Sequence, residues 1–306
     1  MSYGTPESMD RIEAYYTHIR RGRPPAKEQL DDLIRRYEAI GGLFPLRRMT
    51  DAQTEELQKA LDAAHPEAGY RCYQGLKHAE PFIEDGVRAM AEDGIRRAVG
   101  IVLAPHYSVM SVGEYVKRAQ AAAREAGVEM AFVESYHDHP LLIEALSVRV
   151  EKALRGFRPV PPEDVRVMFT AHSLPERILA MNDPYPEQLL ETSRLIAERA
   201  GLSGWQFAWQ SAGATREPWL GPDVVDALKA ARQEGASRVL ICPIGFVSDH
   251  LEILYDLDIE AQAVAAEIGL TLARTEMLNT DPLYISVLAD CVHRKRAHAR
   301  EEAQRP

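Results

Sequence analysis

Apolar, β-branched segments alternate with amphipathic segments along most of this chain of 306 residues. This pattern predicts strands at 70–76, 98–104, 128–134, 165–171, 205–209, 238–243 and 270–274. It predicts helices at 81–92, 112–126, 140–154, 186–200, 222–234 and 249–268. Strands that alternate with helices form parallel sheets, so we expect an α/β protein with helices on both faces of its sheets.

The two halves of the chain resemble each other. Residues 81–108 and 222–248 share the order helix, E-G or D-G turn, strand, proline, aromatic and serine. In this register the turn H-S-L-P at 172–175 matches Y-G-T-P at 3–6. The length also suits two domains of about 150 residues. We therefore expect one domain at 1–150 and a second at 151–306.

The register also exposes a difference between the halves. A full apolar strand precedes His172, whereas only Met1 and Ser2 precede Tyr3. A parallel sheet that lacks a strand has an open edge or an unfilled slot. We expect either that the natural chain begins upstream of Met1 or that the first sheet is built one strand short.

Composition excludes several classes of protein. The net charge of −10 argues against a general nucleic-acid binder, which needs a basic surface. No stretch approaches about 18 apolar residues, and the first residues lack the apolar core of a signal peptide, so we expect a cytoplasmic protein without a membrane segment. Cys72, Cys242 and Cys291 are too scattered for a disulfide framework or a four-thiolate cluster.

The most informative polar residues follow predicted strands. Ligands of open parallel sheets bind beyond the carboxyl ends of the strands. The loops at 3–6, 105–110, 172–177 and 243–252 leave such ends, and we expect them to line one cleft between the domains. Lys77, His78 and His106 also follow strands and could border this cleft.

Three acidic residues are spaced four apart in the last of these segments. Glu252, Asp256 and Glu260 share one face of the predicted helix, where like charges repel unless a cation or solvent balances them. One interpretation is a capping box between Asp249 and Glu252 above a solvated face. The other adds His172, which alone is more typical of a hydrogen-bonded core histidine. An imidazole facing a carboxylate row suits a path for a divalent metal or for protons.

A basic, tyrosine-rich segment lies near the N-terminus. In an acidic chain these cations suggest an anionic ligand, although a solvated helix and loop would look similar. Aromatic faces around them could hold a flat ligand. The cations are Arg20, Arg21, Arg23, Arg35, Arg36, Arg47 and Arg48; the aromatic residues are Tyr3, Tyr15, Tyr16, Tyr37 and Phe44. A separate and weaker candidate is the motif H-D-H at 137–139, which could bind metal but, before Pro140, favours a turn and helix N-cap.

Two motifs in order, H-S-L-P-E-R-I at 172–178 and G-F-V-S-D-H-L-E-I-L-Y-D at 245–256, resemble those of the ferrochelatases, which insert ferrous iron into a porphyrin. Further segments resemble the monomeric, soluble coproporphyrin III ferrochelatases of Gram-positive bacteria. They are Y-G-T-P, Y-Y-T-H-I-R-R-G-R, R-Y-E-A-I-G-G, G-L-K-H-A-E-P-F-I-E-D and W-Q-S-A-G-A-T-R-E-P-W-L-G-P-D. The resemblance implies the chelatase fold, two similar Rossmann-like domains with four-stranded parallel sheets flanked by helices.

The resemblance also implies roles for individual residues. His172 and Glu252 match the metal-site histidine and glutamate, and Asp256 and Glu260 continue the acidic row. Tyr3 matches a tyrosine on the opposite face of the macrocycle. Porphyrin-binding positions are matched by Arg20, Arg36, Tyr37 and Tyr115, and we add Lys77 and His78 at the border of the cleft. Phe44 stands where this branch commonly has a small or polar residue.

The resemblance implies Fe²⁺ and coproporphyrin III as substrates, no prosthetic group, no iron–sulfur cluster, a monomer, and a downstream acceptor for the product, coprohaem. Three alternatives stay open on the sequence: a protoporphyrin IX ferrochelatase, a chelatase for another metal or tetrapyrrole, and a porphyrin or haem carrier without catalysis. A carrier needs no metal path, so the acidic row disfavours it. A chain inactivated by its short N-terminus is a further possibility.

Overall fold

The computed structural model describes the backbone of residues 1–304 and side chains as far as residue 299. Its larger sheet lies in the second half and has four parallel strands in the order β4-β3-β5-β6. These are β3 (Arg166–His172), β4 (Trp205–Gln210), β5 (Arg238–Cys242) and β6 (Thr271–Arg274). All four strands predicted for this half are confirmed.

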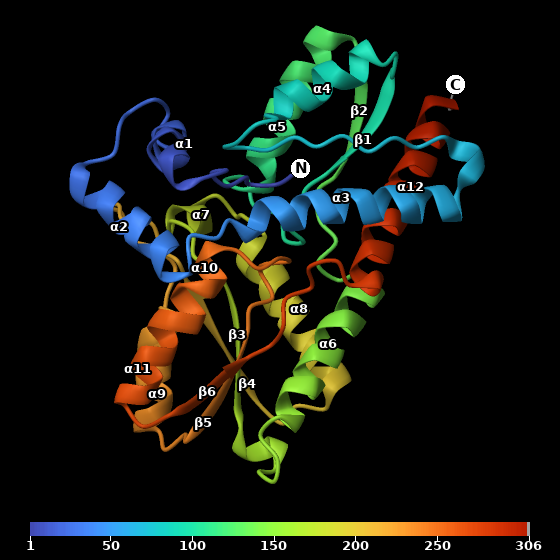
Figure 1. Ribbon diagram of the computed structural model, residues 1–306. Coiled ribbons are helices and arrows are strands. Elements are labelled where there is room, and N and C mark those ends of the chain that lie inside the picture. Colours follow the sequence, from blue (N-terminus) through green and yellow to red (C-terminus); the bar gives the residue numbers. More distant parts are fainter. Residues whose placement is uncertain (305–306) are drawn as a thin grey trace.

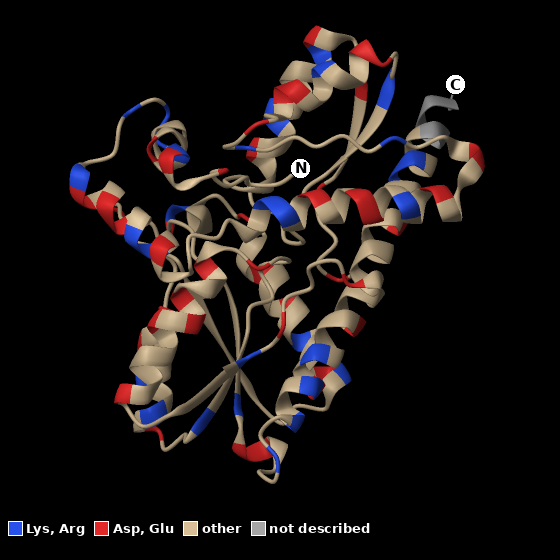
Figure 2. Cartoon of the chain, viewed as in Figure 1, with Lys and Arg blue, Asp and Glu red and all other residues tan. Residues whose placement is uncertain are grey.

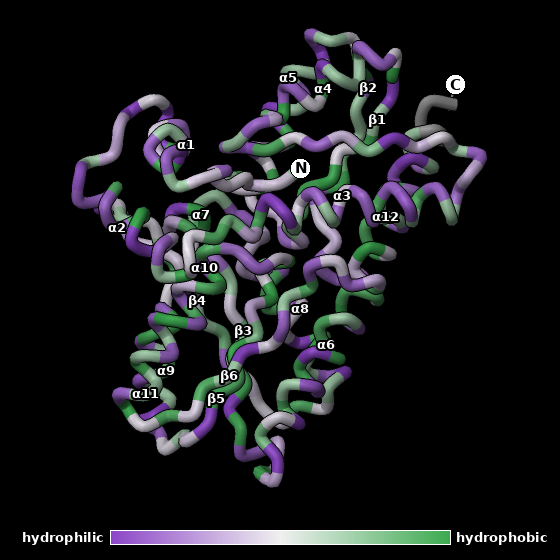
Figure 3. Tube along the Cα trace, viewed as in Figure 1, coloured by the Kyte–Doolittle hydropathy of each residue, from purple (hydrophilic) through white to green (hydrophobic). Residues whose placement is uncertain are grey.

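Strand β3 is apolar because it lies inside the larger sheet, between β4 and β5. Its register pairs Val167 with Trp205 on one side and with Leu240 on the other. Successive side chains point to opposite faces, so Phe169 joins one hydrophobic cluster and Met168 the other. Strands covered on both faces are continuously apolar, as β3 and β5 are along most of their length in Figure 3.

Helices cover both faces of the larger sheet (Figure 1). On one face lie α6 (Pro140–Arg155) and α8 (Tyr185–Ala200), and on the other lie α9 (Val224–Gln233) and α11 (Gln262–Glu267). The predicted helices at 140–154, 186–200 and 222–234 are confirmed within a few residues. Short elements complete this half: α7 (Arg177–Ala180) and the 3₁₀ turn η3 (Pro162–Asp164).

The helix predicted at 249–268 is interrupted. It begins as α10 (Leu251–Leu254), continues as the π-helix η4 (Asp256–Ala261) and ends as α11. The backbone N–H groups of Ile259 and Glu260 both donate to the Tyr255 carbonyl, at 3.1 and 2.9 Å, and the second bond spans five residues. Single π turns of this kind occur mostly inside α-helices and frequently at functional sites.

The smaller sheet has two parallel strands, β1 (Arg97–Ile101) and β2 (Glu129–Val133), not the four expected. Helices α4 (Ile83–Glu92) and α5 (Val112–Ala126) pack together beside it. The strand predicted at 70–76 is wrong: only Leu76 forms isolated bridges, to Ser2 and to Phe82. The reason is that the segment lacks a neighbouring strand along most of its length: Met1 and Ser2 lie between its end and β1, and a cavity of about 820 Å³ lies between the rest of the segment and β1.

The last helix returns to the first half of the chain. Helix α12 (Pro282–Gln304) packs against β1, β2 and α3 (Pro45–Ala64), while α6 packs against α8 of the second half (Figure 1). The remaining N-terminal elements are η1 (Met9–Arg11), α1 (Ile12–Ile19), α2 (Lys27–Ala39) and η2 (Pro66–Ala68). Among residues 1–304, no helix is long and apolar enough to cross a membrane.

Candidate functional site

His172 and Glu252 meet beyond the carboxyl end of the larger sheet. The Nε2 atom of His172, the last residue of β3, lies 3.5 Å from Oε1 of Glu252 in α10. Nδ1 of His172 donates to the Ser173 carbonyl, which directs Nε2 toward the carboxylate. Gly245 permits this approach, because a Cβ atom there would lie 2.4 Å from Cβ of Ala171.

Electrostatics couple this pair. Burial opposes a charge on His172, but the Glu252 carboxylate outweighs burial and raises the pKa of His172 to about 9. Burial likewise opposes a charge on Glu252, and the imidazoles of His172 and His250 overcome it and lower the pKa of this carboxyl well below its usual range. His250 Nε2 lies 3.4 Å from Oε2 of Glu252. The carboxylate therefore lies between two imidazoles.

Asp256, the first residue of the π-helix, joins the two halves. Its Oδ1 atom accepts a hydrogen bond from Nη1 of Arg36 at 3.1 Å, and its Oδ2 atom accepts one from Ser211 Oγ at 2.5 Å. Burial and the nearby charge of Glu252 raise the pKa of Asp256 to about 6, against the effects of Ser211 and Arg36. Figure 2 shows acidic residues of α10 and the π-helix beside basic residues of α2.

The remaining acidic residues of this segment differ in their environments. Glu260 is exposed, and its charge contributes to the raised pKa of Asp256. The predicted capping box is wrong, since the side chain of Asp249 instead accepts hydrogen bonds from Arg274 and Asn279, and α10 has His250 as its N-cap. Glu252 is thus free of a capping role and turns to His172.

Tyr3, Lys77, His78 and Tyr115 cluster in the first half. Tyr3 is 42% exposed, and its ring centroid lies 4.7 Å from that of His78. Lys77 Nζ lies 5.1 Å from the centre of the buried Tyr115 ring. Burial, aided by the charge of Lys77, lowers the pKa of His78 to about 3, so this imidazole is neutral. The cluster presents one cation among aromatic rings.

Arg20 and Tyr37 extend the basic segment. The Nε atom of Arg20, at the end of α1, is buried without a hydrogen-bond partner. A buried donor without a partner is costly, so an anionic group beside Arg20 would stabilise it. Tyr37 is buried and shares a hydrogen bond of 3.0 Å with Thr5, and the Phe44 ring packs 4.7 Å from its ring.

Tyrosines of the first half lie near enough to Glu252 of the second half for its charge to shift their pKa values. Burial first, then the negative charge of Glu252, raise the pKa of Tyr37 to about 12, although the hydrogen bond from Thr5 opposes this. The same carboxylate acts on Tyr3. Together with the Arg36–Asp256 ion pair, these interactions place Tyr3, Tyr37 and Arg36 of the first half near the carboxylates of the second.

Four further residues of the site were not predicted from the sequence. Ser211 follows β4 with a φ angle of 59°, His250 precedes Glu252, Gln210 donates to the Glu252 carbonyl at 3.3 Å, and Tyr185 donates to the His172 carbonyl at 3.1 Å. Q-S at the end of a strand was a usable signal for Gln210 and Ser211. Nothing in the sequence distinguishes Tyr185 from other helix residues.

Other candidates lie elsewhere. His139 is the N-cap of α6, as predicted, and its Nε2 bonds to Asp290. His106 is buried, with its Nε2 atom 2.9 Å from Thr192 Oγ1.

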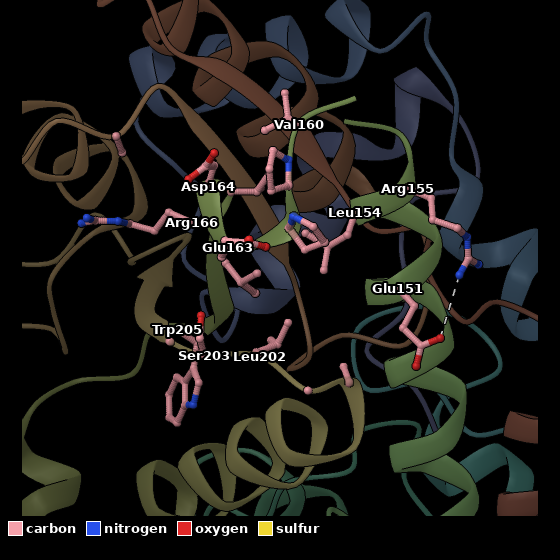
Figure 4. Close-up of a pocket in the computed structure, with 18 of the residues that line it drawn as sticks. Glu151, Leu154, Arg155, Val160, Glu163, Asp164, Arg166, Leu202, Ser203 and Trp205 are labelled. Carbon is pink, nitrogen blue, oxygen red and sulfur yellow. Dashed lines mark ion pairs between the residues drawn. The ribbon is translucent and has the colours of Figure 1, made fainter. Parts of the chain in front are cut away.

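A hollow of about 1110 Å³ lies at the amino ends of the strands of the larger sheet (Figure 4). It is lined by residues of both charges, such as Arg166, Glu163 and Asp164, and lies at the opposite end of β3 from His172.

Comparison with known proteins places this arrangement in a family. The ferrochelatase family profile matches residues 1–296. This chain belongs to the ferrochelatase family. The coproporphyrin III ferrochelatases of Geobacillus thermodenitrificans and Bacillus subtilis are 47% and 46% identical to it, over 99% and 96% of this chain and 96% of each relative.

Solved structures agree on the fold of this ferrochelatase. SirB from Bacillus subtilis with Fe³⁺ matches with a TM-score of 0.58 at 15% identity, over 82% of this chain and 92% of SirB. At that identity the likeness concerns the fold alone. The predicted chelatase fold is therefore confirmed, although the structure has two parallel sheets of two and four strands.

Proposed function

We propose that this ferrochelatase inserts Fe²⁺ into coproporphyrin III, releasing two pyrrole protons and forming coprohaem. The observation that carries the proposal is the pair of His172 and Glu252, 3.5 Å apart, with Tyr3 near enough to feel the charge of Glu252 and Arg36 paired with the neighbouring Asp256. The names of relatives about 47% identical over nearly the whole chain support the choice of porphyrin.

The cations suit a substrate with carboxylates at its rim. Coproporphyrin III carries four propionates, and arginine binds carboxylates with a planar fork of donors. We assign Arg20, whose Nε has no partner, and Arg36 to propionates, with Lys77 near Tyr115 as a third cation. Tyr37, Tyr115 and His78 pack at the ring or its edge, and Tyr3 lies on the face opposite His172.

Residues of the second half would handle iron and protons. In the resting pair His172 is protonated at neutral pH, and Glu252 is charged. The charge of incoming Fe²⁺ favours release of the His172 proton, after which Nε2 and Glu252 can both bind the metal. Asp256, with a pKa of about 6, is suited to accept released protons, and exposed Glu260 leads them to solvent.

A competition experiment tests the porphyrin. Purified protein is mixed anaerobically with Fe²⁺ and equal concentrations of coproporphyrin III and protoporphyrin IX, and the loss of each free porphyrin is followed by absorbance and chromatography. We expect coproporphyrin III to be metallated faster. Preference for protoporphyrin IX would overturn the substrate assignment, and binding of both without metallation would indicate a carrier.

We further propose that the enzyme acts as a monomer and that its product passes to a separate acceptor protein. The resemblance to monomeric ferrochelatases is the basis of both proposals. Light scattering on the purified protein gives the molar mass directly. A value near the 34.3 kDa of one chain is expected, and twice this mass would contradict the proposal.

A further inference from the structure

Helix α8 belongs to the second half by sequence, but its side chains bond to loops of the first half. Gln188 Oε1 accepts a hydrogen bond from Tyr107 N–H at 2.7 Å. Thr192 Oγ1 donates to the His137 carbonyl at 2.9 Å, and Glu191 Oε2 lies 2.9 Å from Nε2 of the same histidine. These partners lie in the loops that follow β1 and β2. The position of α8 is therefore tied to that of the first half.

Asp183, just before α8, is buried and connects the same two parts of the chain. Its Oδ2 atom accepts hydrogen bonds from Ser108 Oγ at 2.9 Å and from Val109 N–H at 2.8 Å. Its Oδ1 atom accepts one from Tyr185 N–H at 3.0 Å, at the beginning of the helix. A buried carboxylate is costly unless its oxygens are hydrogen-bonded, so the three donors and Asp183 hold one another in place.

The loop that Asp183 holds leads into a helix of the porphyrin-binding half. Residues 105–110 lie between β1 and α5, and α5 carries Tyr115, which we assign to the porphyrin. Gly113 N–H donates to the Ser108 carbonyl at 2.9 Å, so the loop is bonded to the first turn of α5. Asp183 therefore fixes the start of α8 relative to a side chain that packs at the ring.

Tyr185, at the start of α8, holds the peptide group between His172 and Ser173. Its hydroxyl donates to the His172 carbonyl at 3.1 Å. On the opposite side of this peptide group, Ser173 N–H donates to the Gln210 carbonyl at 2.8 Å. The pairing of β3 with β5 ends at Phe169, and Tyr185 supplies a donor beyond that point. The peptide group is thus held from both sides.

The orientation of this peptide group determines where the His172 imidazole points. Nδ1 of His172 donates to the Ser173 carbonyl, and Nε2 lies 3.5 Å from Glu252. The orientation of a metal-binding histidine depends on the group that holds its other ring nitrogen. Burial first, then the charges of Glu252 and Asp183, raise the pKa of Tyr185, so its hydroxyl keeps the proton that it donates.

We propose that Asp183 and Tyr185 are positioning residues that fix the His172 imidazole relative to the porphyrin. Asp183 ties α8 to the loop at 105–110, and Tyr185 ties α8 to the His172 carbonyl. The distance between the metal-binding imidazole and the ring is then set by the contact between the two halves. This inference rests on the proposed function, because it assumes that the first half holds the porphyrin.

Tyr185→Phe removes only the hydroxyl, and Tyr136→Phe is its matched control. The Tyr136 hydroxyl is also buried and donates to a backbone carbonyl at 3.1 Å, but its partners, Val102 and Tyr284, lie outside the His172 site. In Tyr185→Phe, kcat should fall about 10- to 100-fold while KM for coproporphyrin III is unchanged. Tyr136→Phe should leave both quantities unchanged. All rates are measured below the melting temperature of each variant.

Binding of Co²⁺ without porphyrin tests the same residue independently of turnover. Co²⁺ is titrated into the full chain, and the visible absorbance that is missing in His172→Ala reports the site. Tyr185→Phe should weaken this binding about 10- to 100-fold, whereas Tyr136→Phe should match the wild type. A wild type that metallates no porphyrin would defeat the proposed function, and the titration would still test how His172 is held.

Asp183→Asn tests the connection to the first half. An amide has one oxygen where the carboxylate has two, so the bonds at Oδ1 or at Oδ2 must be lost. We expect kcat to fall about tenfold. Asp223→Asn is the matched control, because Asp223 likewise accepts a hydrogen bond from the N–H two residues on, that of Val225, at 2.8 Å, within the second half. It should keep the wild-type kcat.

Three results would overturn the proposal. The first is a Tyr185→Phe variant with the kcat and the Co²⁺ affinity of the wild type. The second is an equal loss of kcat and Co²⁺ affinity in Tyr136→Phe, which would show a general effect of losing a buried hydroxyl. The third is an undiminished kcat in Asp183→Asn, which would show that the bond to the loop at 105–110 does not position His172.

Discussion

The guanidinium of Arg36 lies 3.1 Å from the carboxylate of Asp256, although 220 residues separate them in the sequence. Arg36 also bonds to Asp32 at 2.9 Å and lies 4.7 Å from the centre of the Tyr255 ring. The basic segment of the first half is thus joined directly to the acidic row of the second. With Arg36 assigned to a substrate propionate, as we propose, that propionate would compete with Asp256 for this guanidinium.

Replacement of Arg36 by methionine should therefore have two effects. Loss of a hydrogen bond from a charged donor, worth about 1.5–3 kcal/mol, should raise KM for coproporphyrin III by roughly 10- to 100-fold. The pKa of Asp256 should also rise above about 6, because Arg36 is one of the groups that favour its charge. Arg35→Met is the matched control, since Arg35 pairs with Asp32 on the same helix and with no acidic residue of the second half among the described side chains, so both quantities should stay unchanged.

Ser211 offers a separate test of Asp256. Its hydroxyl stabilises the charged carboxylate at 2.5 Å, so Ser211→Gly should raise the pKa of Asp256. Glycine is the better replacement, because the φ angle of 59° would strain alanine. In a pH–rate profile, the acid limb should move to higher pH while activity near pH 9 is retained. An acid limb at the same pH in the variant and the wild type would show that Asp256 does not take part in proton transfer.

The pairing of His172 with Glu252 predicts a pH-dependent stability. The folded pKa of about 9 exceeds the unfolded value of 6.5, so the stabilisation is complete below about pH 6.5 and is lost as pH rises through about 9. For a side chain 32% exposed, we expect a loss of ~1–2 kcal/mol in the free energy of unfolding. Denaturant unfolding at several pH values measures it. Glu252→Gln should flatten the curve, and a curve as steep as wild type would argue against the pair.

Gly245 controls the approach of the loop after β5 to β3. Alanine at this position would place Cβ 2.8 Å from the Ala171 backbone, so Gly245→Ala should destabilise the fold by about 1–3 kcal/mol and displace His172. Gly204→Ala, where a Cβ atom meets nothing within 4 Å, serves as the control. Chemical denaturation compares the two. Equal free energies of unfolding for the two variants would show that the loop after β5 can shift to accommodate the added methyl group at little cost.

Much of the larger sheet could be predicted because its apolar sequence segments lie in strands that are buried in the folded protein. The apolar run before His172 required burial on both faces, and β3 provides it. The π-helix could not be predicted, since a spacing of four between Glu252 and Asp256 suits an α-helix as well. The capping-box interpretation was wrong because the Asp249 side chain accepts hydrogen bonds from Arg274 and Asn279, which lie more than 20 residues away in the sequence.

The smaller sheet shows the limit of local propensity. Residues 70–76 have the composition of a strand, but a strand also needs a hydrogen-bonding neighbour along its length. Here Gly75 bonds to Ser2, and Leu76 forms isolated bridges to Ser2 and Phe82. The return of α12 to β1 and β2 likewise depends on packing between distant parts of the chain. Residues such as Tyr185 enter the site through one bond to the His172 carbonyl, which no sequence pattern reveals.

The central claim is that the His172 site catalyses metal insertion, and turnover tests it most directly. Purified protein is mixed anaerobically with a large excess of Fe²⁺ and coproporphyrin III, and iron coproporphyrin formed per chain is measured for the wild type and for His172→Ala. The account predicts many turnovers for the wild type and none above background for the variant, with porphyrin binding largely kept. One equivalent or less from the wild type, or undiminished turnover in the variant, would contradict it.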